Sequence, residues 1–373
     1  MIVGILKEPG GETRVSLLPE AVTQLTKKGI EVQVESEAGK ASWAYDEDYE
    51  KAGAKISTRQ QISSSADVIL SIYPPDSQLN IPGSKVLIGI YQPLYQQELM
   101  QKWAEKGLTV FSLDMLPRTT RAQSMDVLSS QANITGYKAV ILAANIYPRY
   151  FPMFMTAAGS VAPAKVMILG AGVAGLQAIA TARRLGAVVE VFDTRPAVKE
   201  EVMSLGAKFV EVEGAADATK AGGYAVEQTE EYKQKQQQKI AESTAKADIV
   251  ITTAQIPGKK APVLITEETI NKMRKGSVII DTAAATGGNT SLTRNNETVN
   301  HNGVLIVGNS NLPATMPSDA SKLYGKNILN FLQLITNKEG QLFLNWEDDL
   351  VKGSCITYNG EIINERIKST LPV

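Results

Sequence analysis

The sequence predicts an α/β protein with two domains, each built on a mostly parallel sheet, and with a cleft between them. The first observation is an alternation of short apolar runs with helical stretches, which starts at the N-terminus and restarts at Lys165. Strands and helices that alternate at this spacing form right-handed βαβ units on a parallel sheet. The second observation is the length, because 373 residues are enough for two domains with separate cores.

In the first half of the chain, short apolar runs predict strands, and two longer stretches between them predict helices. The expected strands are Val3–Leu6, Glu31–Glu35, Val68–Ile72, Lys85–Ile90 and Thr109–Leu113, and the expected helices are Pro19–Lys28 and Gln97–Lys106. A long apolar helix over Ile134–Asn145 is expected to lead from one domain to the next.

The second half repeats the alternation. The expected strands are Val166–Leu169, Val188–Phe192, Lys208–Val212, Ile249–Thr252, Ser277–Asp281 and Val304–Val307, and the expected helices include Gly175–Leu185 and Ala197–Leu205. The stretch from Gly214 is rich in Gly, Gln, Lys and Glu, which predicts a long surface loop and then a polar helix around Glu227–Lys246. A disordered insertion is the alternative for this loop. The tail, Ser321–Leu334 and Leu342–Tyr358, predicts a helix and a strand pair.

Composition excludes several classes of function. With 38 basic and 39 acidic residues the net charge is −1, and no basic stripe is interleaved with aromatics, so nucleic acid is not an expected partner. The single cysteine, Cys355, excludes an internal disulfide and fits a reducing compartment. The single histidine, His301, is expected in a turn, and no metal site is predicted because no cluster has metal-ligand spacing.

No membrane span is expected. The longest uncharged runs are 150–164, which contains two prolines, and 166–182, which contains three glycines, a glutamine and a threonine. Both are too interrupted for a transmembrane helix. The N-terminal apolar run is too short for a signal peptide and predicts a strand. We therefore expect a cytoplasmic protein.

A glycine turn predicts a dinucleotide site. The run Lys165-Val-Met-Ile-Leu-Gly170-Ala-Gly172-Val-Ala-Gly175 is a strand, a G-x-G-x-x-G turn and a helix start. Gly170 permits the turn, Gly172 lets the backbone approach a pyrophosphate, and Gly175 lets helix and strand pack closely. The helix N-terminus offers free N–H groups to the phosphates. This context predicts a Rossmann-like domain, whereas a ligand-free turn is the alternative.

Asp193 follows the next strand, 18 residues after Gly175, and is expected to accept hydrogen bonds from the adenosine ribose. Its charge would repel a 2′-phosphate, which favours NAD(H) over NADP(H). Arg195 is a complication, because an arginine there can receive that phosphate. The expected cofactor-binding residues are Gly170, Gly172, Val173, Ala174, Gly175, Asp193, Thr194, Arg195, Arg118 and Gln123. No second motif of this kind follows a strand, so one dinucleotide is expected.

A polar segment between a strand and an apolar helix carries the most specific pattern. It reads Met115-Leu-Pro-Arg118-Thr-Thr-Arg121-Ala-Gln123-Ser-Met-Asp126-Val-Leu-Ser129-Ser-Gln-Ala-Asn133. From the residues alone it fits a solvated loop and a helix N-terminus capped by Ser124 or Asp126. The alternative is a binding segment, because charged, amide and hydroxyl groups are concentrated here.

The pattern R-x-x-R-A-Q-S-M-D-x-L-S-S-Q-x-N resembles the nicotinamide-site segment of the NAD(H)-binding component of proton-translocating transhydrogenases, and the resemblance extends over nearly the whole chain. It implies that Arg118, Gln123, Asp126 and Ser129 surround the nicotinamide and its ribose. It also implies that Tyr224 lies in a mobile loop, near 214–235, that closes over the nucleotide. The family's tail packs on the first domain, which implies domains of 1–128 with 320–373 and of 129–319.

The resemblance implies that hydride passes between NAD(H) on this chain and NADP(H) on a partner subunit, with Re/Si specificity and coupled to proton movement through a separate membrane subunit. It implies a homodimer that is peripheral on the inner face of the cell membrane through its partners. Since the chain ends at Val373 without a hydrophobic segment, a split-subunit arrangement is expected.

The start Lys7-Glu8 and Glu12-x-Arg14 also resembles alanine dehydrogenase, a relative whose reaction moves a proton as well as a hydride. Arg14 is retained, but Tyr73, Gln92 and Ala285 occupy the positions of that family's lysine, histidine and aspartate. Transfer between two nicotinamides needs no such groups, so the sequence favours a transhydrogenase. The second alternative, a non-catalytic NAD-binding protein, needs only the adenosine half of the site and leaves the polar segment unexplained.

Overall fold

The computed structural model describes residues 1–212 and 229–370 and divides into two compact units. Unit 1 consists of residues 1–131 and 314–373, and unit 2 consists of residues 132–313. The bounds expected from the sequence are 1–128 with 320–373 and 129–319. Unit 1 is therefore discontinuous in the chain, with unit 2 inserted into it.

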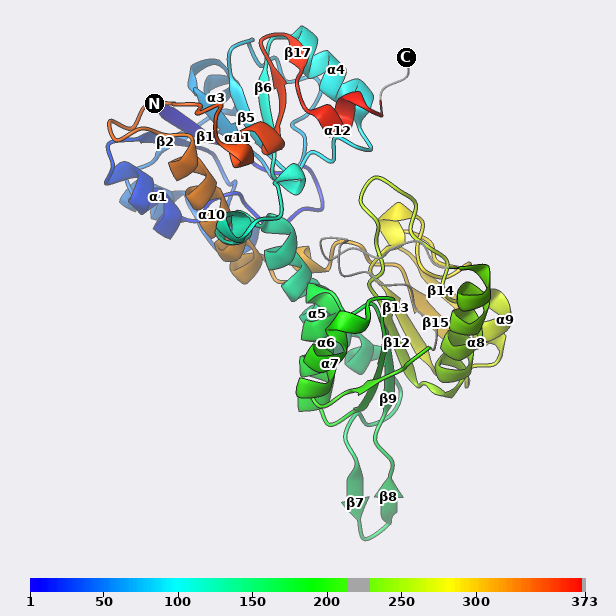
Figure 1. Cartoon of the computed structure of the whole chain (residues 1–373). Coiled ribbons are helices and arrows are strands. Elements are labelled where there is room, and N and C mark those ends of the chain that lie inside the picture. The colour runs from blue at the N-terminus through cyan, green and yellow to red at the C-terminus, as the bar shows by residue number, and fades with distance from the viewer. Residues whose placement is uncertain (213–228, 371–373) are drawn as a thin grey trace. The chain divides into compact units, whose positions relative to one another are not determined.

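Unit 1 contains an eight-stranded sheet among the described residues (Figure 1). From edge to edge its strands are β17 (Glu361–Ile362), β16 (Cys355–Tyr358), β6 (Thr109–Ser112), β5 (Val86–Gly89), β4 (Val68–Leu70), β1 (Ile2–Ile5), β2 (Glu31–Glu35) and β3 (Lys55–Ser57). The run from β6 to β3 is parallel, and β16 and β17 are antiparallel additions at one edge. The last strands of the chain thus extend a sheet that its first residues begin.

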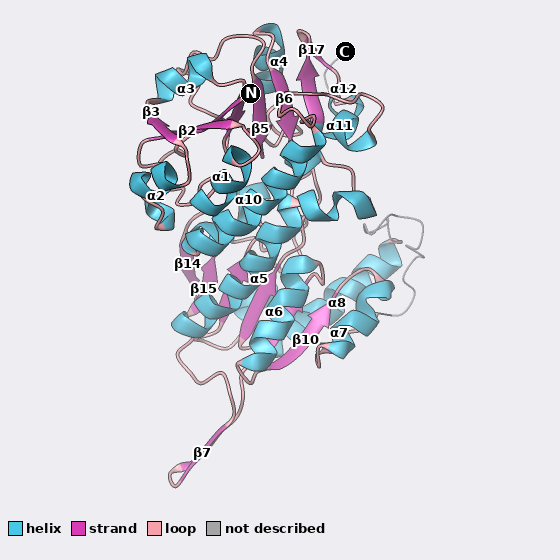
Figure 2. Ribbon diagram, turned by 90° about the vertical axis from the view of Figure 1, so that its left-hand side faces the viewer, coloured by secondary structure: helices cyan, strands magenta, loops and turns pink. Residues whose placement is uncertain are grey.

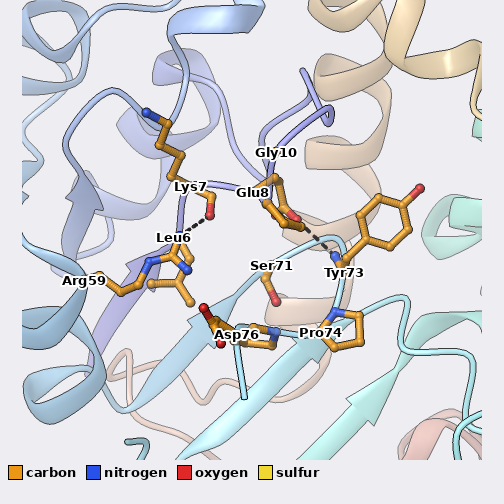
Figure 3. A pocket seen from close by; sticks show the side chains of 11 residues that line it. Leu6, Lys7, Glu8, Gly10, Arg59, Ser71, Tyr73, Pro74 and Asp76 are labelled. Atoms are coloured by element: carbon orange, nitrogen blue, oxygen red, sulfur yellow. Dashed lines mark hydrogen bonds between the residues drawn. The ribbon is translucent and has the colours of Figure 1, made fainter. Parts of the chain in front are cut away.

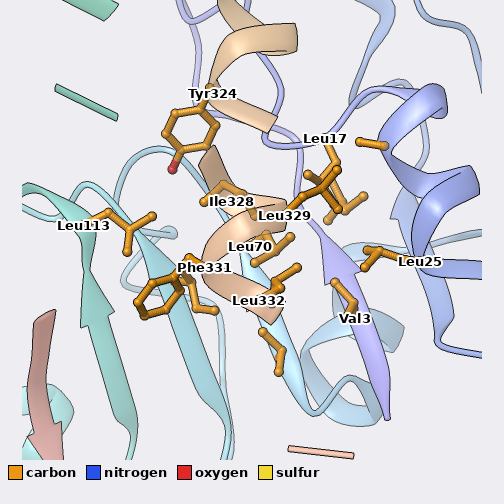
Figure 4. Packing of buried hydrophobic residues seen from close by; sticks show 14 of the residues in the cluster. Val3, Leu17, Leu25, Leu70, Leu113, Tyr324, Ile328, Leu329, Phe331 and Leu332 are labelled. Carbon is orange, nitrogen blue, oxygen red and sulfur yellow. The ribbon is translucent and has the colours of Figure 1, made fainter. Parts of the chain in front are cut away.

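The helices of unit 1 are α1 (Pro19–Thr26), α2 (Asp46–Lys51), α3 (Arg59–Ser65), α4 (Gln97–Glu105), α10 (Pro317–Leu334), α11 (Asp349–Ser354) and α12 (Glu365–Lys368). Helix α10 fills the core of the unit (Figure 4): Tyr324, Ile328 and Phe331 are fully buried and belong to the same apolar cluster as Val3 and Leu17. Residues more than 300 positions apart therefore share one core.

Unit 2 contains a seven-stranded sheet in its described part, with the order β11 (Lys208–Phe209), β10 (Val188–Phe192), β9 (Lys165–Leu169), β12 (Ile249–Thr252), β13 (Val278–Asp281), β15 (Val304–Val307) and β14 (Thr298–His301). All neighbours are parallel except β14 and β15. The predicted α/β class, with two mostly parallel Rossmann-like sheets, is confirmed.

Helices cover both faces of the unit 2 sheet (Figure 2). One apolar cluster joins the strands to α5 (Val127–Ile146), α6 (Val173–Arg184) and α7 (Lys199–Ser204). A second joins alternate strand residues to α8 (Glu230–Lys246) and α9 (Glu267–Asn271). Because successive strand residues point to opposite faces, a parallel sheet buried on both sides has apolar residues at nearly every position.

A hairpin of β7 (Phe154–Thr156) and β8 (Gly159–Val161) extends away from the unit 2 sheet (Figure 1). Its two strands pair only with each other among the described residues, and all six of their residues are exposed. From the sequence this uncharged stretch was recognised only as too interrupted to span a membrane. In the described parts of the chain, no helix combines the length and apolar character needed for a membrane crossing.

Several local predictions were wrong. Helix α5 begins at Val127 rather than Ile134, and β11 ends at Phe209 rather than Val212. The loop range 214–235 is too long, because residues from Glu230 onward are in α8. His301 was expected in a turn and is the last residue of β14, where its Nε2 lies 2.9 Å from Oδ1 of Asn271.

Candidate functional site

The glycine turn of unit 2 lies at the carboxyl end of β9. Gly170 has φ of +106°, a left-handed conformation that favours glycine, and its N–H donates to the Phe192 carbonyl at 2.9 Å. A Cβ on Gly175 would lie 1.8 Å from the Gly170 carbonyl oxygen, so helix α6 packs too closely on the turn for any side chain. A Cβ on Gly172 would meet nothing within 4 Å, which leaves that backbone open to a ligand.

Helix α6 begins at Val173, directly after this open glycine. Gly172 is its N-cap in an extended conformation and provides no side-chain cap. The first N–H groups of a helix have no acceptor within the helix, and they carry the positive end of its dipole. Val173 is exposed and Ala174 is half-buried, so the amides at this end face a surface that can receive an anion such as a pyrophosphate.

Asp193 stands beside the glycine turn, immediately after β10. Its Oδ2 accepts a hydrogen bond from the Ala171 N–H at 2.7 Å, and its Oδ1 accepts one from the Arg195 N–H at 2.8 Å. The Arg195 side chain also donates to both oxygens, from Nε at 3.0 Å and from Nη2 at 2.9 Å. The hydrogen bond with Asp193 raises the pKa of the Arg195 guanidinium above its usual value. Thr194 between them is half-buried.

The polar segment of unit 1 forms a 3-10 helix, Thr120–Met125, before α5 begins. Arg118 and Gln123 are exposed, whereas Ala122 and Met125 are buried. The segment is fixed to α10 at Ser124, whose carbonyl accepts hydrogen bonds from the Asn327 and Asn330 side chains at 2.8 and 2.9 Å.

Arg121, which shares this segment, has a structural contact. Its guanidinium pairs with Asp348 at 2.5 Å and with Asp349 at 3.4 Å, at the start of α11. The second arginine of the pattern therefore ties the polar segment to the C-terminal part of unit 1.

Asp126 caps helix α5. Its Oδ1 accepts the Ser129 N–H at 2.9 Å, and its Oδ2 accepts the Ser129 hydroxyl at 2.6 Å. An N-cap carboxylate that accepts from the third helical residue is the arrangement that the residues alone predicted for Asp126. A carboxylate has about four acceptor positions, so this cap leaves positions on both oxygens for a further donor.

Arg14 lies in a buried polar cluster of unit 1. Its Nη2 lies 2.7 Å from Glu12 Oε2, and both side chains are almost inaccessible to solvent. The same guanidinium donates to Gln131 at 2.8 Å and to the Tyr73 hydroxyl at 3.1 Å. The arginine that an amino-acid dehydrogenase would use for a substrate carboxylate is here occupied by an internal one.

A pocket of about 310 Å³ in unit 1 lies next to this cluster (Figure 3). It is lined by Glu8, Tyr73, Arg59 and Asp76, among others. The Glu8 carboxylate accepts hydrogen bonds from the N–H groups of Ile72 and Tyr73 at 2.6 and 3.1 Å, and burial raises its pKa to about 7. Tyr73 thus stands in this pocket where the alanine dehydrogenase pattern has a lysine.

Sequence reasoning missed two features near the glycine turn. Gly136 of α5 packs on α6 so closely that a Cβ would lie 2.0 Å from the Ala174 carbonyl. Asp281 is fully buried at the end of β13, and its carboxylate accepts the Asn289 N–H at 2.6 Å and the Thr293 hydroxyl at 2.6 Å. The Asn289 side chain then bonds both N–H and carbonyl of Ala254, which follows β12.

These contacts fix the two loops at the carboxyl ends of β12 and β13. A signal for them was present in the Asp281 and Gly288-Asn289 positions, which served in the sequence only to locate Ala285. Within residues 1–212 and 229–370, no group of three or more His, Cys, Asp or Glu side chains is arranged to hold a metal ion. Tyr224, the expected lid residue, lies outside the described residues.

Comparisons with known proteins cover the whole chain. The alanine dehydrogenase/PNT N-terminal domain matches residues 4–135, and the C-terminal domain of the same family matches residues 139–365. The chain is 46% identical over 365 residues to the first portion of a divided NAD(P) transhydrogenase subunit alpha from Rhodospirillum rubrum, covering 95% of each chain. It is 28% identical over 381 residues to the alanine dehydrogenase of Staphylococcus epidermidis, covering 99% of this chain and 96% of that protein.

Solved structures agree. The crystal structure of a transhydrogenase from Sinorhizobium meliloti matches with a TM-score of 0.89 and 46% identity, covering 97% of this chain and 100% of that one. An L-alanine dehydrogenase structure matches with a TM-score of 0.80 at 22% identity, covering 99% and 98%, which shows that the fold is shared.

Proposed function

This chain belongs to the alanine dehydrogenase/PNT family and is more similar to the family's transhydrogenase alpha subunits than to its alanine dehydrogenases, and we propose that it is the NAD(H)-binding component of a proton-translocating transhydrogenase. The observation that carries this proposal is the turn at Gly170–Gly175, which opens α6 with Asp193 at its side. Free helix amides suit a pyrophosphate, and the carboxylate suits ribose hydroxyls. The direct test is NADH titration, followed by hydride transfer after the addition of partner subunits from a related transhydrogenase.

In this proposal Arg118, Gln123, Asp126 and Ser129 act on the nicotinamide half of the cofactor. Two observations support it. Arg118 and Gln123 are exposed although their segment is anchored at Ser124, so they are presented on a fixed backbone. Asp126 and Ser129 orient each other at a helix N-terminus. Preorganised groups of this kind orient a ring without reacting themselves. We assign closure over the nucleotide to Tyr224.

The proposal includes partners. NADP(H) binds on another subunit, transfer is Re/Si-specific and requires that subunit, and protons cross through a membrane subunit that holds this chain at the inner face of the cell membrane. The support is the name of the relatives, which are one portion of a divided alpha subunit. Transfer between two nicotinamides requires no proton donor on this chain, which agrees with Tyr73, Gln92 and Ala285 in place of titratable groups.

Selectivity for NAD(H) is the first prediction. NADH is expected to bind in the micromolar range or more weakly, and NADPH at least about tenfold more weakly, because a 2′-phosphate would meet the Asp193 carboxylate at a cost of about 1–2 kcal/mol. Fluorescence titration with both nucleotides measures this ratio. Equal affinities would show that Arg195 offsets the carboxylate completely.

Absence of amino-acid dehydrogenase activity is the second prediction. The isolated chain is expected neither to oxidise alanine with NAD⁺ nor to reduce pyruvate with NADH and ammonium between about pH 6 and pH 10, because it lacks the proton-transferring groups of that reaction and Arg14 is held by Glu12. The measurement is absorbance at the NADH band against a reaction without protein. A rate above that background would contradict the proposal and would direct attention to Glu8, whose pKa of about 7 suits a base.

We propose further that the chain forms a homodimer through the β7–β8 hairpin. Met155 is 73% exposed and Met153 is 63% exposed, and the stretch 150–164 contains no acidic residue and a single charge-free run from Tyr150 onward. An isolated two-stranded hairpin is only marginally stable in water, and its unpaired edges favour association. A neutral surface meets a copy of itself without repulsion between like charges, which supports a second copy as the partner.

Charge in this hairpin is expected to separate the dimer. Replacing both Phe154 and Met155 with aspartate should raise the dimer dissociation constant by about 10²-fold or more, because each interface would bury four carboxylates without partners. Analytical ultracentrifugation over a range of concentrations measures it. Met203→Asp is the matched control, because Met203 is also exposed but lies on α7. An unchanged dimer in the double variant would contradict this assignment.

A further inference from the structure

Arg195 occupies the acceptor positions on Asp193 that an adenosine ribose would use. Four hydrogen bonds converge on the carboxylate, two at each oxygen. This number equals the acceptor capacity of a carboxylate. Two of the donors are the backbone amides of Ala171 and Arg195, which belong to the glycine turn and to the bend after β10. The other two are Nε and Nη2 of the Arg195 side chain, and only these can leave without moving the backbone.

We propose that the Arg195 guanidinium and the adenosine ribose compete for Asp193, so that Arg195 is the residue that sets how strongly this chain discriminates between NAD(H) and NADP(H). The inference rests on the proposed nucleotide site. Ribose hydroxyls that donate to Asp193 replace the two side-chain hydrogen bonds of Arg195. Binding of NAD(H) therefore costs the separation of an ion pair in which the arginine side chain is 24% exposed and the carboxylate 7% exposed.

The same pair has the opposite effect on NADP(H). While Arg195 remains beside Asp193, its positive charge offsets the carboxylate that would repel a 2′-phosphate. Removal of the cation alone should therefore strengthen NADH binding and weaken NADPH binding. A substitution that merely disturbed the fold would weaken both nucleotides, so opposite signs are specific to competition.

The principal test uses Arg195→Met, which keeps an apolar stem but removes the donors and the charge. NADH is expected to bind about threefold to tenfold more tightly, since a partly exposed ion pair contributes up to about 1 kcal/mol, and NADPH about tenfold more weakly. Calorimetric titration of both nucleotides measures the two changes. Arg184→Met is the control, because Arg184 is an exposed arginine at the other end of α6 and is expected to change neither affinity.

Two further variants test the other partner. Asp193→Asn leaves Arg195 without its carboxylate, so NADPH is expected to gain about tenfold relative to NADH. Adding Arg195→Met to Asp193→Asn should remove that gain, because the cation that receives the phosphate is then absent. The double variant keeps an acceptor for the Ala171 N–H, so the glycine turn retains its support.

An analogue of NADH without the adenosine 2′-hydroxyl gives an independent measurement. In the unsubstituted chain its loss of affinity should be small, because the hydroxyl only replaces an arginine donor. In Arg195→Met the loss should be about tenfold greater, because the hydroxyl fills an otherwise empty acceptor position. Equal losses in both proteins, or a parallel decrease for NADH and NADPH in Arg195→Met, would overturn the competition. Failure of the unsubstituted chain to bind NADH would instead refute the nucleotide site itself.

Discussion

Gly175→Ala is expected to lower NADH affinity by more than about 10²-fold and to lower the thermal unfolding temperature of the protein. The added Cβ would lie 1.8 Å from the Gly170 carbonyl oxygen, which is backbone and cannot rotate away. Either α6 or the turn must move, and both positions determine where the helix amides point. Hydrogen bonds to a charged group contribute about 1.5–3 kcal/mol each, so misdirecting two of them accounts for this loss. Fluorescence titration and differential scanning calorimetry measure the two effects.

Gly172→Ala separates the two contributions. Its Cβ would meet no atom within 4 Å, so the unfolding temperature should stay close to that of the unsubstituted chain. NADH binding should still weaken, because the methyl group occupies the open side of the turn where the pyrophosphate is proposed to approach. If Gly175→Ala retained NADH affinity, or if Gly172→Ala left it unchanged, the phosphate assignment of this turn would be wrong.

Arg118→Ala and Asp126→Asn are expected to reduce single-turnover hydride transfer from NADH to an NADP⁺-loaded partner by about 10²-fold, while NADH affinity changes little. The glycine turn and Asp193 would still bind the adenosine and pyrophosphate, whereas the nicotinamide would lose the groups proposed to orient it. A displacement of about 1 Å at the reacting carbon is sufficient for a loss of this size. Stopped-flow transfer and nucleotide titration on the same variants provide the comparison.

The cap at Asp126 determines which control is needed. Asparagine is as good an N-cap as aspartate, so Asp126→Asn preserves the start of α5, whereas Asp126→Ala should also destabilise the protein by about 1 kcal/mol. Ser129→Ala removes the hydroxyl that donates to Asp126 but keeps the N–H that does so. Transfer rates that fall only in proportion to affinity would show uniform binding and would remove the case for an orienting role.

The features that could be predicted from the sequence depend on local patterns. The strands over Glu31–Glu35, Val188–Phe192 and Ile249–Thr252 have the predicted bounds, because apolar runs between polar ends define buried strands. The glycine turn was recognisable because each glycine has its own steric requirement at a fixed spacing. Asp126 as a cap followed from its position before an apolar helix.

The features that could not be predicted depend on contacts between distant residues. Helices α2 and α3 and strand β3 are short and largely polar, so their pattern is no stronger than that of a loop. The interaction of Arg14 with Gln131 joins positions 117 residues apart, and the competition of Arg195 for Asp193 depends on a side-chain rotamer. The hairpin near Met155 has no alternation of polar and apolar residues, because neither of its faces contacts its own unit.

The insertion of unit 2 into unit 1 has a consequence for the order in which a nascent chain becomes stable. All of unit 2 is synthesised before Ala314, so its sheet can close while the ribosome is still translating. Unit 1 must wait, because Tyr324, Ile328 and Phe331 of α10 fill the core that Val3 and Leu17 begin. Until α10 emerges, the first 131 residues expose an apolar surface that a chaperone would recognise, and a ribosome that stalls near residue 313 leaves one finished unit attached to one that cannot finish.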